Sequence, residues 1–83
     1  MEEFSINKLK DIIANVVGVA VKDITDISGM DIMGRWDSFA VVNLVVAIEV
    51  EANIEVGPNE LEYFKTYQGI LSILSTKGIR VVS

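Results

Sequence analysis

The stretch that decides the fold is residues 38–52, which read SFAVVNLVVAIEVEA and directly follow Asp37. Its many valines would also suit a strand, but strands are commonly only about five or six residues long. The run holds no glycine or proline, and its polar residues do not alternate with its apolar ones. Asp is also a favoured residue immediately before a helix. The sequence therefore predicts a helix over residues 38–52 that begins behind Asp37.

This predicted helix carries two apolar faces. At about 100° per residue, one arc collects side chains that we expect to face the interior, namely Val41, Leu44, Val45, Ile48 and Ala52. A second stripe follows at spacings of three and four and comprises Phe39, Val42, Val46 and Val50. One small bundle cannot bury both faces. The second stripe therefore predicts an interaction surface, unless the helix is unusually buried or pairs with a second copy of the chain.

On the N-terminal side of this helix, the sequence predicts a second amphipathic helix and then a loop. Ser5 precedes apolar residues that recur every three or four positions up to Val17, and Gly18 is suited to end that helix. Residues 19–37 lose this period, as expected of a long loop held against a core. Loops of this length in a small domain usually serve function.

On the C-terminal side, Asn59 is expected to cap a short helical turn and Thr66 to cap a last helix that ends near Gly78. The prediction is an all-α fold, a four-helix bundle of three longer helices and one short one, with a long loop between the first two. Eighty-three residues suit one domain, so we expect a single domain over residues 1–83.

Composition excludes several kinds of chemistry. Cysteine and histidine are absent, so Ser/His/Asp hydrolysis and zinc sites of the cysteine type are excluded, and we expect neither catalytic residues nor a metal site. The net charge of −5 repels nucleic acids and anionic membranes and favours basic protein partners. The richest apolar stretch is well short of the roughly 20 residues that span a bilayer. We expect no nucleic-acid partner and no membrane insertion.

A chemically distinctive motif is RWDSF at residues 35–39, which places the Ser38 hydroxyl in the first turn of the central helix. A phosphodiester on this hydroxyl would lie where the helix dipole and unpaired backbone N–H groups favour an anion. Taken alone, Asp37-Ser38 is simply a helix cap. Together with the upstream amphipathic helix and IEV at residues 54–56, the motif resembles the acyl carrier protein family over nearly the whole chain.

The resemblance implies a carrier rather than an enzyme. In the family, 4'-phosphopantetheine from coenzyme A is attached to the serine of an Asp-Ser-Leu motif, which points to Ser38, with Asp37 as the preceding acid. Phe39 stands where the family usually has leucine. The reactive thiol lies on the arm, so the polypeptide needs neither cysteine nor histidine. The implied partners are a phosphopantetheinyl transferase and the enzymes that load and process acyl groups.

The resemblance also suggests a role for each face of the central helix. The inner residues, Val41, Leu44, Val45, Ile48 and Ala52, would enclose part of an acyl chain, and Ala52 stands where relatives often have a larger phenylalanine. The outer face docks partner enzymes in the family and is often acidic there. Here it is largely apolar, so we expect partner recognition to depend more on apolar contact and less on charge.

The function that follows is that of a free-standing acyl carrier for fatty-acid-like or polyketide-like biosynthesis. A carrier of aminoacyl or peptidyl groups would use the same serine, and an unmodified helical interaction module is the alternative from another class. The acidic N-terminus MEEFS leads into no apolar segment, so we expect a cytoplasmic protein. The short lead from Met1 into the first helix suggests an intact small protein, although a domain excised from a larger synthase would look the same. We expect a monomer.

Overall fold

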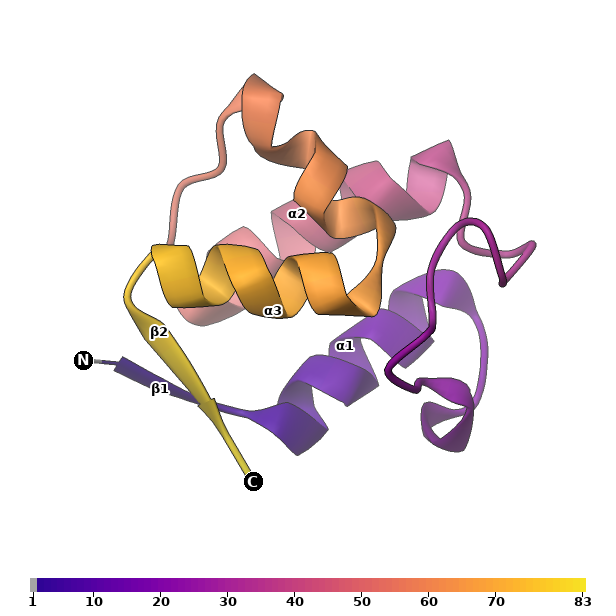
Figure 1. Cartoon of the computed structure of the whole chain (residues 1–83), viewed down its shortest axis with the longest axis horizontal. Helices are drawn as coiled ribbons and strands as arrows, with labels where there is room; N and C mark the ends of the chain where they lie inside the picture. Colours follow the sequence, from indigo (N-terminus) through magenta and orange to yellow (C-terminus); the bar gives the residue numbers. More distant parts are fainter. Residues whose placement is uncertain (1) are drawn as a thin grey trace.

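Each long helix begins behind a side chain that accepts a backbone N–H from the residue three positions further on. The acceptors are the hydroxyls of Ser5 and Thr66 and the carboxylate of Asp37, all three predicted as helix starts. The computed structural model describes residues 2–83, and Met1 lies outside the described residues. The elements are β1 (Glu2–Ser5), α1 (Ile6–Val17), η1 (Val21–Asp23), α2 (Ser38–Ala52), η2 (Pro58–Lys65), α3 (Tyr67–Thr76) and β2 (Ile79–Val82). Figure 1 labels the three α-helices and the two strands.

The ends of α1 and α2 use residues that tolerate a left-handed backbone. Gly18 has φ 84°, and its N–H donates to the Ala14 carbonyl at 2.8 Å. Asn53 ends α2 with φ 55°. The predicted loop between the two helices is present, and it contains the single 3-10 turn η1.

The short helical segment η2 departs from its predicted start. Asn59 lies inside η2 and does not cap it, because η2 already begins at Pro58. The Gly57 N–H, just before the segment, donates instead to the Glu60 carboxylate at 2.8 Å. Proline suits the first position of a helix, where no intrahelical hydrogen bond is lost.

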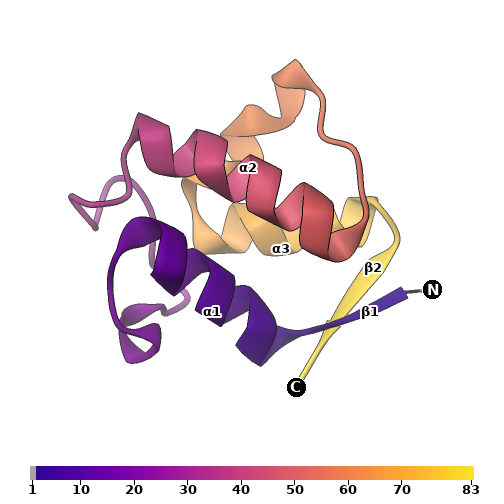
Figure 2. The same ribbon diagram turned by 180° about the vertical axis from the view of Figure 1, so that it is seen from behind.

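The all-α prediction is incomplete, because the two ends of the chain form a small parallel sheet. β1 pairs with β2 in the register Glu2↔Ile79 to Ser5↔Val82. Arg80 and Glu3 form an ion pair across the sheet. Figure 2 shows the two strands together on one side of the helices. Four-residue strands so far apart in the chain carry no local signal strong enough to predict their pairing.

The core lies between the three α-helices and η2. α1 and α2 pack side by side in opposite directions, and α3 packs against η2 and β2 (Figure 2). The fully buried side chains include Leu9 and Ile13 of α1 and Ile70 and Leu74 of α3. Complete burial of such a side chain stabilises the fold by roughly 1.5 to 3 kcal/mol. In residues 2–83, no helix is both long and apolar enough to cross a membrane.

Candidate functional site

Ser38 is the first residue of α2, and its side chain is exposed. The Asp37 carboxylate accepts the Ala40 N–H at 2.9 Å, and the Asp37 carbonyl accepts the Val41 N–H at 3.0 Å. These bonds fix the direction in which α2 leaves the loop. The hydroxyl is therefore presented to solvent at the positive end of a helix dipole.

The loop before Ser38 is anchored by Trp36. This side chain is buried, and its indole N–H donates to the Phe64 carbonyl at 3.1 Å. Next to it, the Arg35 guanidinium donates to the Gly18 carbonyl at 3.1 Å, which ties the loop to the end of α1. The residues immediately before Ser38 are thus held from two sides.

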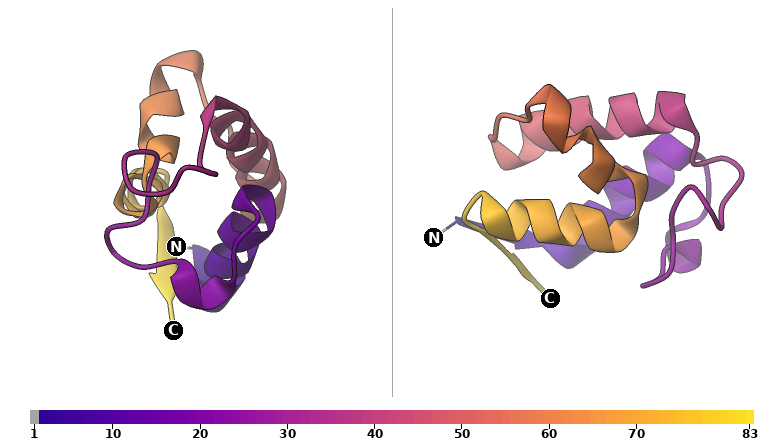
Figure 3. Two further views of the ribbon diagram at one scale, coloured as in Figure 1. Left: turned by 90° about the vertical axis from the view of Figure 1, so that its right-hand side faces the viewer. Right: turned by 45° about the horizontal axis from the view of Figure 1, so that its top comes forward.

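A second set of contacts ties the middle of the loop to the junction of η2 and α3. The Met30 N–H donates to the Lys65 carbonyl, and the Tyr67 N–H donates to the Ser28 carbonyl, both at 2.9 Å. Gly29 lies between these bonds, and a β-carbon there would overlap Thr66. Figure 3 shows the loop at the end of the bundle where α2 begins.

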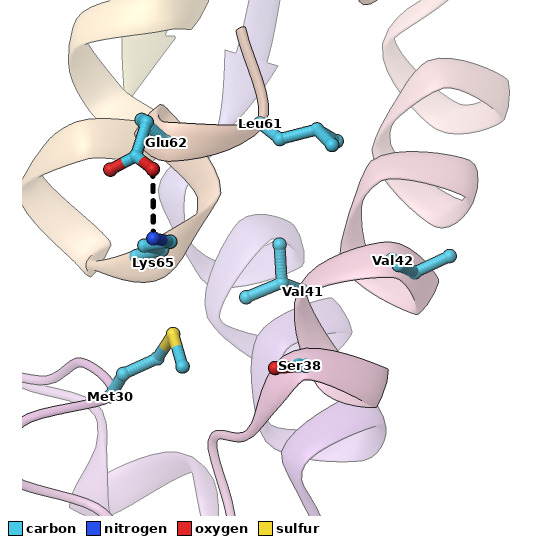
Figure 4. A pocket seen from close by; sticks show the side chains of 7 residues that line it. All are labelled: Met30, Ser38, Val41, Val42, Leu61, Glu62 and Lys65. Atoms are coloured by element: carbon cyan, nitrogen blue, oxygen red, sulfur yellow. Dashed lines mark hydrogen bonds and ion pairs between the residues drawn. The ribbon is translucent and has the colours of Figure 1, made fainter. Parts of the chain in front are cut away.

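These contacts form a cavity of about 290 Å³ beside Ser38. Figure 4 shows Ser38 and Val41 on the α2 side, with Met30 of the loop and the Glu62–Lys65 ion pair of η2 opposite. The residues that line it are Met30, Ser38, Val41, Val42, Leu61, Glu62 and Lys65. Sequence reasoning missed the contributions of the loop and of η2, because only the tertiary contacts bring them to Ser38.

The five inner-face residues of α2 are all buried. Among them, Val41 lines the cavity beside Ser38. Leu44 and Ile48 are fully buried in the core, and Val45 and Ala52 are also enclosed there. An acyl chain would reach these four only by displacing core side chains.

The outer stripe of α2 is exposed. The exposed fractions of Phe39, Val42, Val46 and Val50 are 81%, 54%, 56% and 73%. The two acids near the far end of the stripe are both engaged within the protein. Glu49 accepts the Val56 N–H at 2.9 Å, and Glu51 pairs with Lys8 of α1 at 2.9 Å. The stripe thus presents mainly apolar surface.

Two side chains with shifted pKa values, Tyr67 and Glu60, lie outside the cavity. Burial, with the nearby Asp26 carboxylate, raises the pKa of Tyr67 above its ordinary value. The hydrogen bond from the Gly57 N–H, together with the ion pair to Lys77 at 3.0 Å, lowers the pKa of Glu60. Both groups sit in contacts that hold η2 and α3 in place, and neither lines the cavity beside Ser38.

Comparison with known proteins identifies the family. Residues 7–74 match the family model described as the phosphopantetheine attachment site. An acyl carrier protein of Bdellovibrio bacteriovorus is 38% identical over 72 residues, an alignment that covers 86% of this chain and 91% of that protein. The chain belongs to the acyl carrier protein family. It is therefore a carrier and not an enzyme, and its prosthetic group is 4'-phosphopantetheine.

Membership of the acyl carrier protein family also implies the classes of partner. They are a phosphopantetheinyl transferase, which attaches the arm, and the biosynthetic enzymes that use it. The sequence motif RWDSF at residues 35–39 pointed to this family, and the comparisons confirm that the chain belongs to it.

Proposed function

We propose that Ser38 carries the phosphopantetheine arm and that the protein holds acyl groups as thioesters for fatty-acid-like or polyketide-like biosynthesis. The observation that carries this proposal is the exposed Ser38 at the capped start of α2. A transferase has to bring the diphosphate of coenzyme A up to that hydroxyl, and a buried serine would prevent this. The acyl cargo is favoured over an aminoacyl one by the name of the Bdellovibrio relative.

The residues around Ser38 suit the group. The Asp37 carboxylate already accepts the Ala40 N–H. The N–H groups of Ser38 and Phe39 have no acceptor within the helix, so a phosphodiester on Ser38 would meet these donors and a favourable dipole. The arm supplies the thiol that forms the thioester. The chain contributes attachment and presentation, and it holds neither histidine nor cysteine that would catalyse thioester hydrolysis.

Incubation with coenzyme A and a broad-specificity phosphopantetheinyl transferase tests the attachment. We expect a mass gain of one phosphopantetheine in the wild type and none in Ser38→Ala. Lack of a gain under conditions that modify a known carrier would instead favour an unmodified helical module. Mass spectrometry of the protein from its native host then distinguishes acyl from aminoacyl cargo.

We further propose that partner enzymes dock on the apolar stripe of α2, defined by Phe39, Val42, Val46 and Val50. We infer a partner with an apolar docking surface, because the four stripe residues are exposed and uncharged, and the neighbouring Glu49 carboxylate accepts the Val56 N–H at 2.9 Å. Surface charge therefore has little part in holding such a partner on the stripe. On the buried face of α2, Val41 lines the cavity beside Ser38.

The docking proposal is tested by the rate of acyl transfer from a partner enzyme, measured against salt. We expect a weak salt dependence and a large loss of rate in Val46→Asp. Asn43→Asp is the matched control, because it adds the same charge at an exposed position beside the stripe. A steep loss of rate with salt, with Val46→Asp unaffected, would contradict the proposal. Sedimentation of the wild type checks for self-association through the stripe, and we expect a monomer.

A further inference from the structure

The cavity beside Ser38 has a mixed lining that apolar cargo alone does not explain. Met30, Val41 and Leu61 provide apolar surface, and Lys65 provides a positive charge. Among the described residues that line the cavity, Lys65 is the one cation. Its ammonium pairs with the Glu62 carboxylate at 2.8 Å, and both side chains are substantially exposed. Such an ion pair is worth little in water and exchanges readily for another anion.

We propose that this cavity holds the phosphopantoyl end of the arm, with Lys65 as the counter-cation of the phosphodiester. The proposal rests on attachment at Ser38. In that case the phosphate is bonded directly to the serine oxygen at the cavity rim, and the pantoyl group with its two geminal methyls comes next. The thiol and its cargo lie at the opposite end of the arm. The groups nearest the cavity are therefore an anion followed by a small branched apolar group, which matches the lining.

The negative charges around Ser38 call for a cation in the cavity, and Lys65 provides it. The Asp37 carboxylate lies one residue away, and the Glu62 carboxylate lines the same cavity, so two negative charges oppose the phosphodiester there. The start of α2 offsets this repulsion in part. Lys65 supplies the remaining positive charge, and its backbone is held in place by the Met30 N–H at 2.9 Å.

The experiment is NMR of the loaded protein, with nuclear Overhauser effects measured from the geminal methyls of the arm to the methyl groups of Met30, Val41 and Leu61. We expect these contacts in the wild type. Lys65→Gln should lower the docked population about 1.5- to fivefold, the range for an exposed ion pair. Glu62→Gln should raise it, because it removes both a like charge and the competing partner of Lys65. Added salt should weaken the contacts in the wild type but not in Lys65→Gln.

Lys22→Gln is the control, because Lys22 is exposed in η1 and lines no part of the cavity. It should leave the contacts unchanged. Mass spectrometry first establishes that Ser38 is loaded. A chain that takes no phosphopantetheine overturns the proposed function and this inference with it. A loaded protein overturns this inference alone if its geminal methyls contact none of the three residues, or if Lys65→Gln and Lys22→Gln behave alike.

Discussion

Replacing Trp36 with phenylalanine should destabilise the protein strongly, because Trp36 anchors the loop that leads to Ser38. The substitution removes the indole N–H and leaves the buried Phe64 carbonyl without its partner at 3.1 Å. An unsatisfied buried polar group costs about 1 to 3 kcal/mol. The smaller ring also leaves a void, which adds about 1 kcal/mol if the surroundings do not close it. We therefore expect Trp36→Phe to lose about 2 to 4 kcal/mol of unfolding free energy.

The loss is measured by denaturant unfolding followed by far-UV circular dichroism, because the variant lacks the only tryptophan of the chain. Small domains have about 5 to 15 kcal/mol of stability, so the variant should still fold. Phe39→Leu is the matched control, since Phe39 is exposed, and its effect should stay within about 0.5 kcal/mol. A loss in Trp36→Phe no larger than that of the control would refute the anchoring role of Trp36.

Three further predictions concern the core and the contacts of η2. Leu44→Ala should cost about 2 to 5 kcal/mol on denaturant unfolding, whereas Val42→Ala on the exposed stripe should cost far less; equal losses would reverse the assignment of the two faces. Gly69→Ala should cost about 1 to 3 kcal/mol although alanine favours helices, because the new β-carbon would overlap a backbone carbonyl oxygen of η2; a stabilised variant would contradict this contact. The hydrogen bond from Gly57 and the ion pair to α3 lower the pKa of Glu60, so its contribution to stability is present above the ordinary value of 4.5 and is lost as pH falls through the lower folded pKa. The difference in unfolding free energy between the wild type and Glu60→Gln should therefore narrow at acidic pH. A difference that stays constant from neutral pH to pH 3 would contradict a stabilising role of the ionised Glu60.

Local sequence was sufficient to predict the three α-helices and their starts. Ser5, Asp37 and Thr66 stand where the structure begins α1, α2 and α3, because a cap is formed by residues within one turn of one another. The division of α2 into a buried and an exposed face also follows from the helical period alone. These features depend on residues that are neighbours in the chain, and so the pattern reveals them.

The sheet and the cavity depend on contacts between distant segments. β1 and β2 are four residues each and lie at opposite ends of the chain, so neither has a local signal beyond a few apolar residues. The cavity forms because the Met30 and Tyr67 N–H groups bind carbonyls across the gap between the loop and the η2–α3 junction. Sequence by itself therefore determined the three α-helices, the family and the candidate serine. Only the tertiary structure decided which side chains surround that serine, because backbone hydrogen bonds and close packing between segments remote in the chain leave no periodic trace in the sequence.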